Sequence, residues 1–136
     1  MKRIYLSQVN ISNFRSFGAN TIIDIPAKPG LFIVYGMNGL GKTTFFEALE
    51  WILTGDVRRI GGEIRKGQLD NFLTRHGAKA LSHRVTVNFG DTSLTRTATS
   101  SPTTKDIVEL LCRDDWSPVP SDTSTYFRLT MFLPQS

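Results

Sequence analysis

The stretch that governs the fold is LFIVYGMNGLGKTTFFEALEWILTG, residues 31–55. Residues 31–35 are apolar without alternation, which is typical of a strand buried on both faces. A glycine-rich loop follows at residues 36–41. Residues 42–54 then indicate a helix that is apolar nearly all round, and Gly55 is suited to cap its carboxyl end. Strand, glycine loop and buried helix in this order predict an α/β domain.

The loop matches the pattern GxxxxGK[ST], the phosphate-binding P-loop. Glycines let successive backbone N–H groups approach a phosphate without side-chain clash, and the following helix directs the positive end of its dipole at the same charge. Lys42 would reach the β- and γ-phosphates, the Thr43 hydroxyl would ligate Mg²⁺, and Thr44 would contact the α-phosphate region. The residues expected to bind the nucleotide are Gly36, Asn38, Gly39, Leu40, Gly41, Lys42, Thr43 and Thr44.

Shorter patterns outside this stretch predict the remaining elements. Alternating apolar residues indicate strands, Gly and Pro indicate turns, and apolar spacing of three and four indicates helices. In chain order we expect a strand at 2–14, a turn at 13–20, a strand at 21–25, a long surface excursion at 55–81, an antiparallel pair at 84–89 and 93–99 turning at Gly90-Asp91, and a helix at 105–113.

Composition excludes several classes of protein. The chain has 136 residues, room for one domain, and no apolar run long enough to cross a bilayer. Its amino terminus alternates and so lacks the apolar core of a signal peptide. The single cysteine, Cys112, forms no internal disulfide, which fits a reducing, cytoplasmic setting and argues against small secreted scaffolds and zinc modules.

The positive charge is concentrated in the middle of the chain. The net charge is +4, from 16 Lys and Arg against 12 Asp and Glu. Residues 55–84 hold seven basic and three acidic residues, a local excess equal to that total. Such a segment either attracts an anion such as a nucleic-acid backbone or is a solvated loop, and charge alone leaves both interpretations open.

Three segments together resemble one family. VNISNFRSFG at 9–18, GMNGLGKTT at 36–44 and TMFLPQS at 130–136 are similar to the amino-terminal half of an ABC-type ATPase head of the SMC, Rad/SbcC and RecF group, and WILTG at 51–55 also fits. The resemblance implies an α/β P-loop NTPase fold, lobe I of the head, with mixed and antiparallel strands around the P-loop helix. Residues 1–136 would form this lobe, ending at the Q-loop, with the second lobe and the coiled coil outside the chain.

The resemblance also implies roles for individual residues. Arg15 would lie near the nucleotide phosphates, and Asn38 would face the dimer partner at the γ-phosphate. Gln135 would contact Mg²⁺ or the attacking water, sharing the catalytic role with Lys42. Arg58 or Arg59 resembles a basic residue that links DNA contact to ATP turnover. Four of these residues have a plainer interpretation. Arg15 could be a surface residue at a strand end, Gln135 a polar terminus, and Arg58 and Arg59 solvated loop charges.

Three catalytic parts of such a head are not found in the sequence. The acidic Walker B pair has no convincing match, since Asp114-Asp115 has helical spacing and Asp24 lies in a strand before the loop. The sequence at 60–63 only superficially resembles the signature loop, and His76 and His83 are expected in loops rather than as the switch histidine. We therefore expect phosphate binding without the complete catalytic set, and ATP hydrolysis only by a longer protein.

The partners implied are those of an SMC-like head. They are ATP with Mg²⁺, the second lobe, a second head in a homodimer, double-stranded DNA and a nuclease subunit, with no membrane and a nucleoid location in a bacterium. DNA repair, chromosome organisation and antiviral (antiphage) defence all use such heads. The alternative is a nucleotide-responsive protein-interaction module without a DNA role. A small-molecule kinase would need a lid with catalytic arginines, and the strands before the P-loop fit it poorly.

Overall fold

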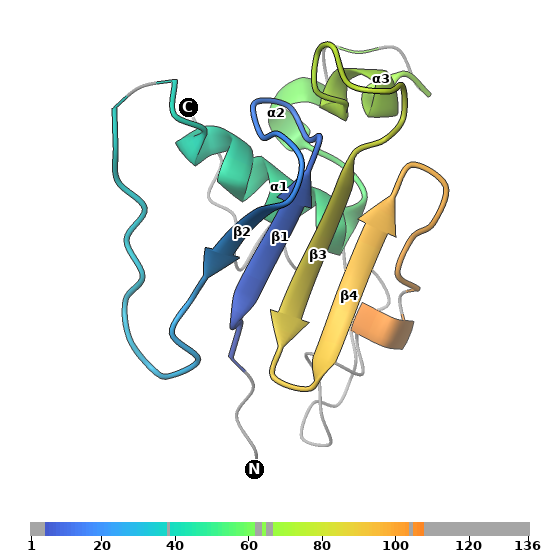
Figure 1. Cartoon of the computed structure of the whole chain (residues 1–136). Coiled ribbons are helices and arrows are strands. Elements are labelled where there is room, and N and C mark those ends of the chain that lie inside the picture. The colour runs from blue at the N-terminus through green and yellow to red at the C-terminus, as the bar shows by residue number, and fades with distance from the viewer. Residues whose placement is uncertain (1–4, 38, 62–63, 65–66, 104, 108–136) are drawn as a thin grey trace.

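The computed structural model describes residues 5–37, 39–61, 64, 67–103 and 105–107. A four-stranded sheet and the helix after the glycine loop form the centre of this part of the chain (Figure 1). The elements are β1 (Gln8–Ser12), β2 (Thr21–Asp24), α1 (Lys42–Thr54), α2 (Arg58–Gly61), α3 (Leu69–Leu73), β3 (Arg84–Phe89) and β4 (Thr92–Thr97).

The sheet has the order β2-β1-β3-β4, and each pairing is antiparallel. Its register aligns one apolar row across all four strands, because Val9 pairs with both Ile23 and Val87, and Val87 pairs with Leu94. Alternation along each strand directs such a row to a single face. The α/β fold class predicted from the sequence is confirmed, and the four described strands form its antiparallel portion.

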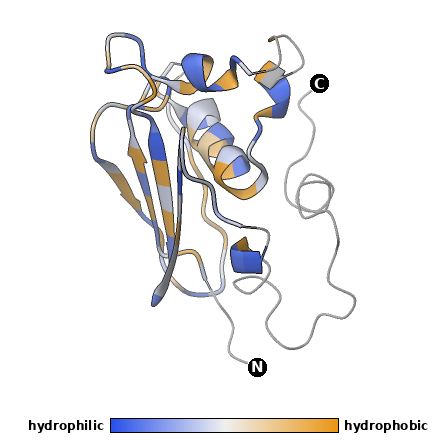
Figure 2. Ribbon diagram, turned by 90° about the vertical axis from the view of Figure 1, so that its right-hand side faces the viewer, coloured by the Kyte–Doolittle hydropathy of each residue, from blue (hydrophilic) through white to orange (hydrophobic). Residues whose placement is uncertain are grey.

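Helix α1 covers the apolar face of the sheet, and none of the described helices lies on the opposite face (Figure 2). The helix buries Phe45, Ala48, Trp51 and Ile52 against the strands. At its carboxyl end Gly55 adopts a left-handed conformation with φ 78°, and its N–H donates to the Trp51 carbonyl oxygen at 2.8 Å. Both the bounds of this helix and its glycine cap were predicted correctly from the sequence.

The turn between β1 and β2 is held by a distant segment of the chain. Phe14 forms an isolated antiparallel bridge with Thr74. The Arg15 N–H donates to the Leu73 carbonyl oxygen at 2.7 Å, and the Arg75 N–H donates to the Asn13 carbonyl oxygen at 2.8 Å. These bonds fix the backbone of residues 13–15 against the chain that leaves α3.

The apolar segment at 31–35 is not the buried strand that its composition predicts. It forms no described strand, and Leu31 and Tyr35 are 86% and 90% exposed. Figure 1 shows the connection between β2 and α1 looping out beyond the β2 edge. A strand buried on both faces needs hydrogen-bonded neighbours, and the described strands pair with one another instead.

Other boundaries also differ from the sequence prediction. The first described strand is confined to β1, and the surface excursion expected at 55–81 contains the short helices α2 and α3. The hairpin of β3 and β4 is confirmed, with Gly90 at φ 62° in its turn. Of the helix expected at 105–113, residues 105–107 are helical and the rest lies outside the described residues. No helix in the described ranges is long and apolar enough to cross a membrane.

His83 is a buried polar residue at the junction of α3 with the core. Its Nε2 lies 2.9 Å from Asp70 Oδ1 and its Nδ1 lies 2.9 Å from the Thr74 hydroxyl oxygen. The ring centroid is 4.9 Å from that of Trp51. Burial lowers the pKa of His83, while the hydrogen bond to Asp70 and its charge act in the opposite direction. His83 is thus a loop residue, as expected, but one that joins α3 to the core.

The lowered pKa of His83 predicts a loss of stability in acid. Below the usual histidine pKa of about 6.5, the unfolded chain binds a proton that the folded chain resists, so the free energy of unfolding falls as the pH drops from 6.5 toward the folded pKa. NMR titration of His76→Gln, which leaves His83 as the single imidazole, should give a midpoint below 6.5. A midpoint at or above 6.5 would contradict the burial argument.

Candidate functional site

The amino end of α1 presents unpaired donors toward solvent. Gly41 is its N-cap in a left-handed conformation with φ 88°, and no side chain caps the helix. The first turn contains no acidic residue. The first N–H groups of a helix lack partners within the helix and carry its positive partial charge. This end of α1 is therefore suited to an anion.

Lys42 and Thr43 add side-chain groups to these backbone donors. The Lys42 ammonium donates to the carbonyl oxygens of Gly36 at 2.5 Å and Met37 at 2.7 Å, across the loop that precedes it. An ammonium has three N–H donors, so these two contacts leave one for a phosphate oxygen. Thr43 is exposed at the helix end. A cation, free backbone donors and an exposed hydroxyl form the donor set that a Mg²⁺–nucleotide requires.

The turn between β1 and β2 packs directly against this helix end. The Ser16 hydroxyl donates to Thr44 Oγ1 at 3.2 Å. A Cβ atom at Gly41 would lie 3.1 Å from Phe17 Cζ and 3.2 Å from Ser16 Oγ. Gly41 is therefore required both for its positive φ and for the close approach of the turn. Ser16 and Phe17 therefore contact the end of the phosphate loop, and Arg15 precedes them in the same turn.

Arg15 lies on the same turn and extends along α1. Its backbone has φ 50°, a conformation uncommon for a non-glycine residue and frequent at functional sites. Its Nε lies 3.1 Å from Glu47 Oε2, and the Glu47 side chain is only 5% exposed. Arg59 Nε donates to Glu47 Oε1 at 2.8 Å, and Arg59 Nη2 also contacts that oxygen. One buried carboxylate thus holds two arginines, one from the turn and one from α2.

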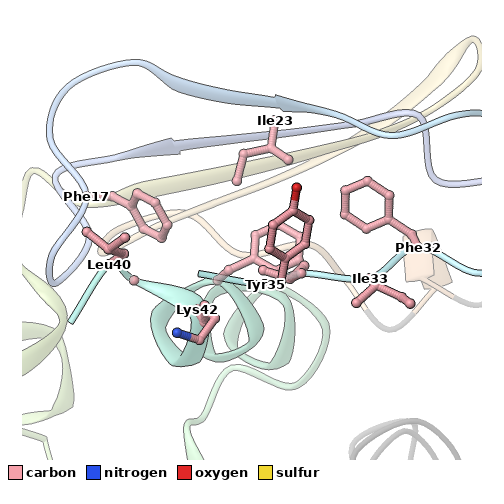
Figure 3. Close-up of a pocket in the computed structure, with 10 residues that line it drawn as sticks. Phe17, Ile23, Phe32, Ile33, Tyr35, Leu40 and Lys42 are labelled. Atoms are coloured by element: carbon pink, nitrogen blue, oxygen red, sulfur yellow. The ribbon is translucent and has the colours of Figure 1, made fainter. Parts of the chain in front are cut away.

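An apolar pocket of about 250 Å³ opens beside the phosphate loop (Figure 3). Phe17 and Leu40 lie at one end of it, and Phe32 and Ile33 lie at the other. Ile23 contributes from β2 and Phe45 from α1. The pocket therefore lies between the edge of the sheet, the exposed 31–35 segment and the helix.

The structure gathers most of the residues that the sequence singled out. Arg15 and the described loop residues (Gly36, Gly39, Leu40, Gly41, Lys42, Thr43 and Thr44) surround the amino end of α1. Asn38 and Gln135 lie outside the described residues. Arg58 is exposed on α2, whereas its neighbour Arg59 is paired with Glu47. Asp24, weighed as a catalytic acid, accepts a hydrogen bond from Gln8 Nε2 at 2.8 Å.

Sequence analysis missed two contributors to this site, Ser16 and Glu47. Glu47 had one visible signal, a carboxylate within the otherwise apolar run FFEAL at 45–49. Buried carboxylates occur almost only with charged or hydrogen-bonding partners, so its position called for a nearby cation. Across the described ranges, no three His, Cys, Asp or Glu side chains gather as a metal site.

Comparison with protein families decides where the chain belongs. The family model described as an AAA domain matches residues 8–123. The chain belongs to the AAA domain family. This match spans the sheet, the phosphate loop and α1, and the relatives below identify the branch as the SMC/RecF-type ATPase heads.

Several relatives share the sequence of this region. The chromosome segregation protein sudA of Emericella nidulans is 31% identical over 99 residues, 73% of this chain and 8% of that protein. The structural maintenance of chromosomes protein 3 of Saccharomyces cerevisiae is 31% identical over 65% of this chain and 7% of its own length. The DNA replication and repair protein RecF of an Arthrobacter species is 30% identical over 44% and 14%. The match thus spans only a small part of each relative.

A solved structure has the same fold. It comes from work on the ATP-driven dimerization and DNA-stimulated activation of SMC ATPases, and superposes with a TM-score of 0.55 over 91% of both chains at 18% identity. At this identity the likeness concerns the fold alone. It supports the head-type α/β fold of this AAA domain.

The contact of Gly41 with the turn makes a stability prediction. Gly39 and Gly41 both have φ 88°, so alanine is strained by about 1–2 kcal/mol at either position. Only at Gly41 does the added Cβ meet a neighbour, the Phe17 ring. Urea unfolding should show Gly41→Ala less stable than its matched control Gly39→Ala by roughly a further 1 kcal/mol. Equal free energies of unfolding would show that the turn does not pack on this glycine.

Proposed function

We propose that this AAA domain binds ATP with Mg²⁺ at residues 36–44, at the amino end of α1. The observation that carries the proposal is the uncapped helix end, with Lys42 folded over the loop and Arg15 brought beside it. Glycines at positive φ leave the backbone donors accessible to a phosphate. Membership of an ATPase family supports a nucleotide as the anion.

The roles of the loop residues follow from their positions. Lys42 neutralises the β- and γ-phosphates, and the Thr43 hydroxyl ligates Mg²⁺, whose chemistry is to neutralise charge on the phosphate oxygens. Thr44 keeps its hydroxyl bond with Ser16 and faces the α-phosphate region. Gly36, Gly39, Leu40 and Gly41 form the loop around the phosphates. For Asn38 and Gln135, which lie outside the described residues, the family resemblance supports a place in this loop for Asn38 and a contact with Mg²⁺ or the attacking water for Gln135.

For a longer protein, we propose an SMC-like ATPase head in which residues 1–136 form the first lobe. Two heads would close around ATP, and hydrolysis would be coupled to double-stranded DNA or to a nuclease subunit. Support comes from the neighbour described by ATP-driven dimerization and DNA-stimulated activation, and from relatives named for chromosome segregation and DNA repair. Without Walker B and signature motifs, this chain alone would bind ATP with negligible turnover.

A second candidate is a nucleotide-responsive protein-interaction module. The observation that favours it is the region from α2 to the start of β3, in which the apolar Phe72 and Leu81 are exposed among charged residues. Arg58, Lys79 and Arg84 are also exposed in this region and are equally available to DNA phosphates. The salt dependence of DNA binding separates the two candidates.

Removal of the Lys42 ammonium tests the nucleotide site. Lys42→Ala should abolish Mg²⁺–ATP binding, measured by isothermal titration, because the β- and γ-phosphates lose their cation. Lys28→Ala, which removes an equal charge from the exposed connection before the loop, should bind as the wild type does. Equal ATP affinity in the Lys42→Ala and wild-type chains would refute the assignment.

Salt titration tests the DNA role. If the segment 55–84 contacts DNA, affinity for a short duplex should fall steeply with salt, and Arg58→Ala should reduce the slope of log K against log salt by about 1. Lys28→Ala again serves as the charge control. Absence of any DNA affinity at low salt, with ATP binding intact, would favour the protein-interaction module.

A further inference from the structure

The Glu47 carboxylate is the most constrained charge among the described residues of the site. It projects from α1 shortly after the phosphate loop and is almost fully buried. Its two oxygens are divided between two partners, with Oε2 facing Arg15 and Oε1 facing Arg59. A buried carboxylate is tolerated only when cations or donors compensate for its desolvation, so both arginines are drawn to it.

Arg15 has two separate restraints. The Leu73 carbonyl oxygen holds its backbone N–H and so fixes where the side chain begins. Glu47 Oε2, at 3.1 Å from Nε, fixes where the guanidinium ends, although Arg15 remains 28% exposed. Contact through Nε leaves the terminal nitrogens of the guanidinium fork available as donors to another anion. A guanidinium restrained in this way loses less conformational entropy when it binds a phosphate.

We propose that Glu47 is a positioning residue that holds the Arg15 guanidinium beside the phosphate loop, where Arg15 contacts the bound nucleotide. The same carboxylate ties Arg59 of α2 to this position, so α2 and the β1–β2 turn share one anchor on α1. This inference rests on the proposed binding of ATP at residues 36–44. It adds a residue that contacts no phosphate itself and acts through Arg15.

Simple electrostatics predicts the opposite result for loss of this charge. A carboxylate near a phosphate site repels the phosphates, so its neutralisation would tighten nucleotide binding. If Glu47 instead orients Arg15, its neutralisation releases the guanidinium and weakens binding. The sign of the change in ATP affinity therefore distinguishes positioning from a general effect of charge.

The test is a double-mutant cycle on Mg²⁺–ATP affinity in the full chain. Glu47→Gln should weaken binding by about tenfold, because the released Arg15 loses about one charged hydrogen bond to the nucleotide phosphates. In the Arg15→Ala background, Glu47→Gln should have no further effect, because the residue through which it acts is gone.

The matched control is Glu50→Gln. Glu50 lies on the same helix, and its side-chain oxygen accepts a hydrogen bond from the Arg58 backbone N–H. The Glu50→Gln chain should bind ATP as the wild type does.

Tighter or unchanged ATP binding by Glu47→Gln would overturn the proposal. So would a loss that adds fully to that of Arg15→Ala, since a merely structural role predicts additivity. If Glu47→Gln does not unfold cooperatively in urea, Glu47→Asp, which keeps the charge but withdraws it from Arg15, takes its place in the cycle with the same expectations. ATP affinity that is unaffected by Lys42→Ala would instead refute the underlying nucleotide site.

Discussion

The close approach of the β1–β2 turn to Gly41 is the constraint on which the site depends. The turn can lie against the helix only because residue 41 has no side chain, and it brings Arg15, Ser16 and Phe17 with it. The segment that leaves α3, at residues 73–75, fixes the backbone of this turn by hydrogen bonds. The position of the arginine beside the phosphate loop is thus set by packing that begins about sixty residues away in the chain.

Local signals were sufficient to predict much of the fold. The P-loop helix, its left-handed glycine cap and the hairpin of β3 and β4 are each encoded within a few residues, by periodicity or by turn chemistry. The phosphate loop was recognisable for the same reason, since the glycines that shape its backbone lie within a few residues of one another in the sequence. The order of strands in the sheet, by contrast, required the structure.

Where the sequence analysis was wrong or silent, the deciding factor was a partner distant in the chain. The run at 31–35 has the composition of a buried strand, but composition cannot supply the neighbouring strand that burial requires. Glu47 could be noticed as a charge among apolar residues, but its two arginines come from a turn before it and a helix after it. The link that His83 makes between α3 and the core likewise depends on Asp70 and Trp51, which lie far from it in the sequence.

The strand order has a consequence for how this domain is made. Strand β1 lies between β2 and β3 in the sheet. Its pairing with β3, which sets Gln8 opposite Asn88, can form only after about eighty further residues have been synthesised. During synthesis only the β1–β2 pair can form at first, and an isolated hairpin of that kind is marginal in water. The nascent chain therefore carries an open apolar strand edge until β3 leaves the ribosome. Until then, this open edge is a place where the chain can associate with other chains.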